Sequence, residues 1–145
     1  MQRRILLVED DAAIRELFSG VLKAAGMEVV EAADGVSAFD AVSDVSPDLV
    51  ITDIAMPRMD GIELTRALRH KPSTERVPII AVTGEPAVFA RARGAGCTAI
   101  VSKPCAARDL VRLVEQFIGR QHESRIADAL NPWTGADRRT HSRPS

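Results

Sequence analysis

The sequence is poor in cysteine, in net charge and in long apolar segments, and each shortage excludes a class of protein. Its two cysteines, Cys97 and Cys105, suit a reduced cytoplasmic protein better than a disulfide scaffold. The three histidines stand apart from one another, which argues against a metal site built on them. A formal net charge of −1 favours neither a nucleic-acid-binding nor a membrane-surface protein. No apolar run approaches the length of a membrane span or of a signal-peptide core.

Short apolar runs alternate instead with amphipathic segments along most of the chain. Residues 5–8 form a continuous apolar run of strand length, and apolar residues then recur at helical spacing from residue 14 until Gly26. Asp11 stands where its carboxylate can cap this first helix. The alternation repeats four times, which predicts strands over 28–32, 49–52, 78–82 and 99–101 and helices over 36–45, 61–69, 86–93 and 106–118.

This alternation predicts an α/β fold with a doubly wound, five-stranded parallel sheet, because its inner strands are apolar on both faces and helices separate them. The length of 145 residues suits one domain. We expect that domain to span residues 1–119. The remaining residues, 120–145, are expected to be a tail with a short helix over 122–130, ended by Asn131-Pro132, and then a mobile segment.

Residues with chemical potential follow four of the predicted strands. Glu9-Asp10 follows the first, Asp53 ends the third, Thr83 follows the fourth and Lys103 follows the fifth. The carboxyl ends of parallel strands meet at one edge of a sheet, so these side chains should lie together. Three carboxylates in one crevice repel each other unless protons or a hard divalent cation neutralise them. Mg²⁺ is the natural candidate.

Each of these residues has a simpler explanation when taken alone. Asp53 is compatible with a turn former at a strand end, and the acids after the first strand are compatible with helix capping. Thr83 is compatible with a turn before Gly84, and Lys103 with a solvated cation beside a proline. Independent turn formers, however, need not place acid, acid, hydroxyl and amine at the same ends of four strands. The joint pattern therefore favours a functional site.

In this order, the motifs resemble those of the receiver domains of two-component response regulators, over roughly residues 4–118. The resemblance implies the flavodoxin-like strand order 2-1-3-4-5. It implies that Asp53 accepts a phosphoryl group and that Thr83 and Lys103 contact that group. It also implies a commonly cis bond between Lys103 and Pro104. The implied Mg²⁺ ligands are Asp10 and Asp53 directly, Glu9 through water, and the backbone carbonyl of Ala55.

The same resemblance implies a signalling protein of the cytoplasm and a stand-alone single-domain regulator, not an enzyme with an external substrate. The phosphodonor would be a histidine kinase, a histidine phosphotransfer protein or a small acyl phosphate. The output partner would be an unidentified protein. Neither nucleic acid nor a membrane is expected to bind. One alternative is a degenerate receiver that binds its partner without phosphorylation. The second alternative is a haloacid-dehalogenase-like phosphatase with an external substrate. Such an enzyme would need a second Asp where Ala55 stands. The third is nucleic-acid binding through the arginine-bearing tail, which has a charge of +2 from Gly119 onward.

Several positions depart from the family pattern. Many receivers have Tyr or Phe where this chain has Ile100, and the chain contains no Tyr at all, which excludes an aromatic switch at this position. The segment from Thr83 to Lys103 is about two residues short, which predicts a shortened fourth helix or a reshaped output face. Cys105, in place of an aromatic residue, is interpreted as a packed thiol. Ala55 and Glu85 occupy positions that flank the path of hydrolytic water.

Overall fold

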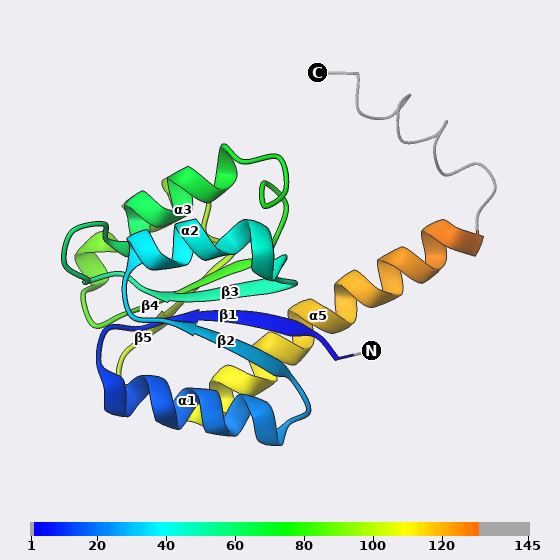
Figure 1. Ribbon diagram of the computed structural model, residues 1–145, viewed down its shortest axis with the longest axis horizontal. Helices are drawn as coiled ribbons and strands as arrows, with labels where there is room; N and C mark the ends of the chain where they lie inside the picture. Colours follow the sequence, from blue (N-terminus) through cyan, green and yellow to red (C-terminus); the bar gives the residue numbers. More distant parts are fainter. Residues whose placement is uncertain (1, 131–145) are drawn as a thin grey trace.

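Five parallel strands form the predicted sheet in the computed structural model, which describes residues 2–130 (Figure 1). The strands are β1 (Arg4–Val8), β2 (Glu28–Ala32), β3 (Leu49–Asp53), β4 (Ile79–Thr83) and β5 (Ala99–Ser102). Their order is β2-β1-β3-β4-β5, and every neighbouring pair is parallel. The doubly wound, flavodoxin-like order 2-1-3-4-5 is therefore confirmed.

Helices cover both faces of this sheet. They are α1 (Ala12–Ala24), α2 (Gly35–Val45), α3 (Gly61–Arg69), α4 (Phe89–Ala95) and α5 (Ala107–Leu130), with a short 3₁₀ turn, η1 (Pro86–Val88), before α4. Helices α1 and α5 pack together on one face, and α2, α3 and α4 follow one another on the other (Figure 1). No helix among residues 2–130 is long and apolar enough to cross a membrane.

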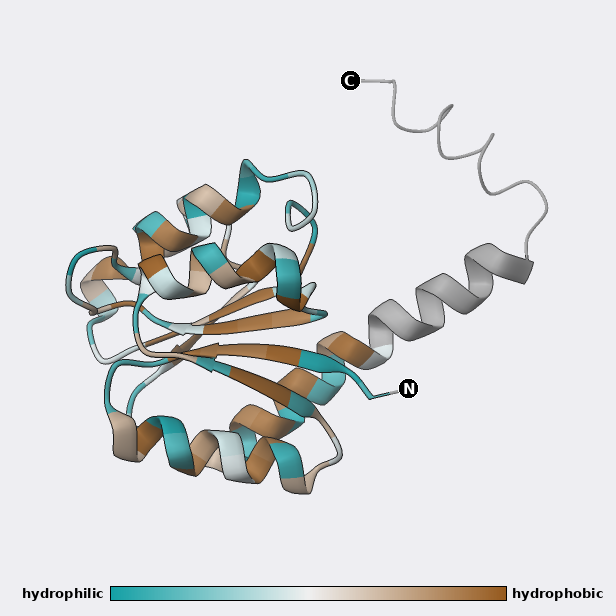
Figure 2. Cartoon of the chain, in the orientation of Figure 1, coloured by the Kyte–Doolittle hydropathy of each residue, from teal (hydrophilic) through white to brown (hydrophobic). Residues whose placement is uncertain are grey.

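The strands consist mainly of hydrophobic residues, as the continuous apolar runs predict (Figure 2). In β1, Ile5 and Leu7 belong to the core beneath α1 and α5, whereas Leu6 and Val8 belong to the core beneath α2 and α3. Every residue of β3 and β4 is buried. The two polar strand ends in this interior, those of β3 and β4, are therefore surrounded by packed apolar structure, which fixes their positions.

The fourth helix is short, as the reduced spacing between Thr83 and Lys103 predicts. A single 3₁₀ turn leads into α4, which has seven residues and ends at Gly96 in the left-handed conformation (φ 113°). The α-helix itself therefore begins at Phe89 and not at Pro86. Proline has no amide hydrogen and is favoured in a first turn, so its place at the start of η1 is a normal one.

The fifth helix is longer than predicted. The expected end near Ile118 and the separate helix over 122–130 are wrong, because α5 is one continuous helix through Leu130. The predicted helix ended at residue 118, just before Gly119, but a glycine inside a helix costs only about 1 kcal/mol, and good helix formers follow it. The predicted mobile segment, 131–145, lies outside the described residues.

Candidate functional site

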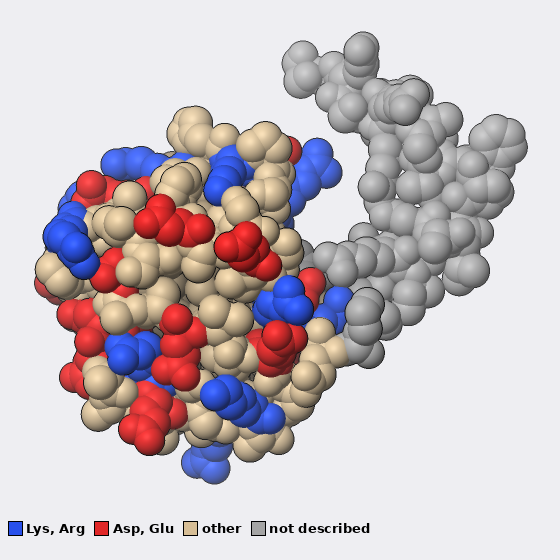
Figure 3. Space-filling model, in the orientation of Figure 1, with Lys and Arg blue, Asp and Glu red and all other residues tan. Residues whose placement is uncertain are grey.

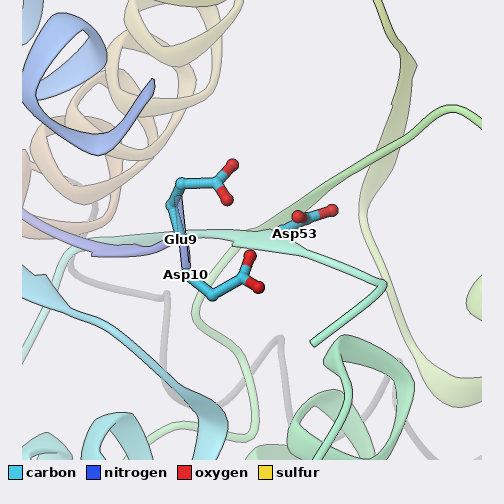
Figure 4. Close-up of side chains that lie close together, drawn as sticks. All are labelled: Glu9, Asp10 and Asp53. Carbon is cyan, nitrogen blue, oxygen red and sulfur yellow. The ribbon is translucent and has the colours of Figure 1, made fainter. Parts of the chain in front are cut away.

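Three carboxylates converge at the edge of the sheet where β1 and β3 end (Figure 4). Glu9, Asp10 and Asp53 each offer one oxygen, and these oxygens all lie within 4.8 Å of one another. Glu9 and Asp53 are only 3% and 6% exposed, whereas Asp10 is exposed. The cluster is thus buried on one side and open on the other. A donor set of carboxylate oxygens, partly open to solvent, fits a hard divalent cation such as Mg²⁺.

The Lys103 ammonium group lies against this cluster. Its Nζ donates a hydrogen bond of 3.1 Å to Oδ2 of Asp53 and lies 3.8 Å from Oε1 of Glu9. The bond between Lys103 and Pro104 is cis, as the resemblance implies. Burial alone would lower the pKa of Lys103, but the hydrogen bond to Asp53 and the surrounding carboxylates outweigh it, so the pKa is raised. Lys103 is therefore a permanent cation at neutral pH.

Thr83 lies beside Lys103 at the end of β4 and is 3% exposed. The Lys103 amide donates to the carbonyl of Thr83 at 2.8 Å. The Glu85 amide donates to the Thr83 hydroxyl at 3.1 Å. Because the hydroxyl oxygen accepts this bond, its own hydrogen is left to donate elsewhere. The structure thus brings together the acids, the hydroxyl and the amine that the sequence singles out, and Ala55 lies on the loop directly after Asp53.

Local contacts fix the loop that carries the first two acids. The Asp11 carboxylate accepts from the amides of Ala13 and Ile14 and so caps α1, as predicted. One Glu9 carboxylate oxygen accepts from the Asp11 amide at 3.1 Å. The Arg15 guanidinium donates to the Glu9 carbonyl at 2.7 Å. Helix α1 therefore holds the backbone of Glu9 from one side and its carboxylate from the other.

Gly61 sets the position of Asp53, a role that the sequence analysis missed. Its amide donates to the Ile54 carbonyl at 2.9 Å, so the start of α3 lies directly on the end of β3. A Cβ at residue 61 would lie 2.8 Å from Cα of Ile54 and closer still to the carbonyl oxygen of Asp53. Asp60 and Glu63 close a reciprocal capping box that fixes this helix start. The signal available in the sequence was the Asp60-Gly61 pair directly before the predicted helix.

Substitution of Gly61 by alanine is expected to destabilise the protein, by about 1–3 kcal/mol, because the new methyl group must displace the backbone that carries Asp53. Urea denaturation measures the change. Gly20 on α1 is the matched control, since a Cβ there meets no atom within 4 Å. Gly20→Ala should be neutral or stabilising by up to about 1 kcal/mol. Equal stabilities for the two variants would contradict the proposed close approach at Gly61.

The carboxyl group of Glu9 holds its proton unusually strongly. Burial raises its pKa from 4.5 to about 7, with a further contribution from the charge of Asp53, while the Asp11 amide and Lys103 oppose the shift. When no cation is bound, the Glu9 carboxyl group is therefore only partly ionised near neutral pH. A cation that replaces this proton gains a ligand, which links metal affinity to pH.

We expect the metal-free protein to lose stability as pH rises from about 4.5 to about 7. The unfolded Glu9 loses its proton over this range while the folded Glu9 keeps it, so folding is favoured below the range and the advantage is lost as pH passes the folded pKa. Mg²⁺ affinity has the opposite trend and should rise about tenfold per unit up to pH 7. Melting curves and calorimetric titration measure both. Glu9→Gln should flatten both profiles over this range, and an unchanged slope would contradict the assignment.

A five-stranded sheet in the order 2-1-3-4-5, with an acidic cluster, a threonine and a lysine at its carboxyl edge, defines a receiver domain. Residues 5–115 match the family model described as response regulator receiver domain, and the chain belongs to that family. It is therefore a module of two-component signalling, not an enzyme of the classical kind.

Relatives of known name support this assignment. The polar-differentiation response regulator DivK of Brucella anthropi is 30% identical over 125 residues, which cover 82% of this chain and 98% of the relative. Among solved structures, Vibrio cholerae chemotaxis protein CheY4 has a TM-score of 0.77 at 30% identity and covers 81% of this chain and 99% of its own. The receiver domain of sensor histidine kinase PA1611 from Pseudomonas aeruginosa, described with a magnesium ion in its active-site cleft, has a TM-score of 0.76 at 30% identity, covering 82% and 99%.

Proposed function

We propose that this receiver accepts a phosphoryl group on Asp53 in the presence of Mg²⁺ and signals to a protein partner through a change in its surface. The observation that carries this proposal is the contact between the Lys103 ammonium and Oδ2 of Asp53, inside a cluster of three carboxylates and next to the Thr83 hydroxyl. An isolated strand-end aspartate would have no reason to be 6% exposed among two further acids.

The proposed chemistry is a displacement at phosphorus. A carboxylate oxygen of Asp53 forms a bond to phosphorus while the bond from phosphorus to the donor nitrogen or oxygen breaks, and the leaving group departs with that electron pair. Lys103 would pair with one phosphoryl oxygen, and the free hydrogen of the Thr83 hydroxyl would be donated to another.

Glu9, Asp10, Asp53 and the backbone carbonyl of Ala55 are the proposed Mg²⁺ ligands. The bound ion would neutralise the carboxylates and orient the phosphodonor. The described magnesium in the Pseudomonas aeruginosa relative and the three oxygens within 4.8 Å here support the assignment. Asp10 reaches the cluster from the exposed side, so it is the ligand that an entering ion would meet first.

The proposed partners follow from the class of protein. A histidine kinase or a histidine phosphotransfer protein would supply the phosphoryl group, and a downstream protein would bind the changed surface. Acidic and basic side chains are interspersed over the face shown in Figure 3, without a large patch of one sign among the described residues, so that face does not favour nucleic acid. Both cysteines are free thiols, which fits a cytoplasmic place of action.

Constitutive binding is the second candidate, and one observation favours it. Ile100 of β5 packs against the cluster formed by β4, α3 and α4, so no aromatic ring is available at this position to turn between two orientations. In that case the protein would bind its partner equally well with and without phosphate.

Intact-mass measurement after incubation with Mg²⁺ and a small phosphodonor distinguishes these candidates. A gain of one phosphoryl group that chelator abolishes would support the proposal. Absence of any gain in folded protein that binds Mg²⁺ would overturn it and favour constitutive binding.

A further inference from the structure

A cavity of about 400 Å³ opens beside the acidic cluster, between the loop after β3 and the start of α4. Thr83 and Ala55 line it on the side of the proposed phosphoryl site. Ile62 and Val88 contribute apolar wall. Thr83, which is proposed to bind phosphate, thus lines the cavity, whereas Lys103 and the three carboxylates of the cluster do not.

Three charged side chains line this cavity: Asp60, whose carboxylate caps the start of α3, Glu85, and Arg91, the single cation of the lining. Arg91 is exposed on α4, and it makes no hydrogen bond or ion pair with any of the described residues. Its guanidinium group is therefore not committed to the fold. The cavity is lined by both Arg91 and Thr83, and Ala55 contributes only a methyl group to its wall. A cation at the wall of such a cavity attracts an anion that enters it.

The direction of the proposed displacement places a donor's leaving group on this side. Attack by Asp53 proceeds in line, so the leaving group departs on the side of phosphorus opposite the attacking oxygen. Thr83 and Lys103 hold the phosphoryl oxygens between the two. On this geometry the leaving group would face the cavity that Ala55 and Glu85 line.

We propose that this cavity is a leaving-group subsite and that Arg91 selects phosphodonors whose leaving group is a carboxylate. This inference deepens the proposed function and rests on it. With an acyl phosphate, the bond from phosphorus to the acyl oxygen breaks, and the carboxylate takes the electron pair and a negative charge, to which the Arg91 guanidinium can donate hydrogen bonds. With phosphoramidate, whose nitrogen is already protonated at neutral pH, the bond from phosphorus to nitrogen breaks, the nitrogen keeps the electron pair, and the leaving group is uncharged ammonia. Arg91 then has no charge to stabilise.

The test compares acetyl phosphate with phosphoramidate on the same preparations, in Mg²⁺, with kcat/KM for phosphorylation read by intact mass. Arg91→Ala should lower kcat/KM for acetyl phosphate by about fivefold and for phosphoramidate by less than about twofold, the scale expected for one charge-assisted contact at a partly exposed site. Arg91→Lys should retain part of the preference. Arg93→Ala is the matched control, because Arg93 is exposed on the same helix and does not line the cavity.

The ratio of the two rate constants is independent of the fraction of protein that is folded, so a partly unfolded variant still gives an answer. An equal loss with both donors, or no loss with either, would overturn the subsite and leave phosphorylation of Asp53 intact. If the wild type takes phosphate from neither donor, the proposed function fails and the subsite fails with it.

Discussion

Asp53→Asn is expected to abolish phosphorylation by either a small donor or a histidine phosphotransfer partner, a loss of the whole phosphoryl increment. The amide of asparagine has no carboxylate oxygen to attack phosphorus, and of the three acids only Asp53 accepts a hydrogen bond from Lys103, whose Nζ lies 3.8 Å from Glu9. Intact mass after incubation with donor and Mg²⁺ measures the result. Asp44→Asn is the control, because Asp44 is exposed on α2 and away from the cluster.

The Asn variant should remain folded, so the loss can be assigned to chemistry. Asparagine has nearly the same shape as aspartate, and its carbonyl oxygen can still accept the hydrogen bond from Lys103. It also removes one charge from a cluster in which the charge of Asp53 raises the pKa of Glu9. Phosphate found on the Asn variant would show that another residue is the acceptor and would require a new assignment of the site.

Lys103→Met should slow phosphorylation of Asp53 roughly a hundredfold, the loss typical of removing one preorganised charge from a transition state. Methionine keeps most of the length of the side chain but has no charge and no donor for a phosphoryl oxygen. Rapid-quench kinetics with acetyl phosphate measures the rate. Lys23→Met is the matched control, because Lys23 is exposed on α1 and its nearest carboxylate, on Glu31, is 4.0 Å away.

The same substitution also changes the metal site, which gives a second measurement. The charge of Lys103 lowers the pKa of Glu9, so its removal should raise that pKa and make Mg²⁺ binding more dependent on pH. If Asp53 of the Met variant is phosphorylated at the wild-type rate, the role given to Lys103 is contradicted. Mg²⁺ would then be the only positive charge that the reaction needs.

The sequence predicted those parts of the fold that depend on hydrophobic pattern. The strands were visible because parallel strands are buried on both faces, so Ile5 to Val8 contains no polar break. The acids, Thr83 and Lys103 could be placed together because strand ends share an edge, whatever the details of packing. These are consequences of topology and need no knowledge of side-chain geometry.

Features that depend on three-dimensional contact could not be read in the same way. The close approach of Gly61 to Asp53 joins residues eight positions apart through a backbone path that no periodicity encodes. Arg91 was one of many exposed arginines until the structure placed it at the wall of a cavity next to Thr83. The end of α5 was missed because a glycine inside a helix and a glycine after one look alike in sequence.

The hydrogen bond from the Glu85 amide to the Thr83 hydroxyl places a spectroscopic reporter on the main chain. A side-chain rotation of Thr83 that moves its hydroxyl oxygen must either carry the Glu85 amide along or break its bond, whereas a turn of the O–H hydrogen alone leaves that bond in place. Glu85 is also the N-cap residue of η1, so a movement of its amide would be passed to the turn that leads into α4. The NMR resonance of the Glu85 amide would therefore report whether this hydrogen bond is formed. Ile100 lies on the neighbouring strand and the chain contains no tyrosine, so no tyrosine ring current would shift that resonance.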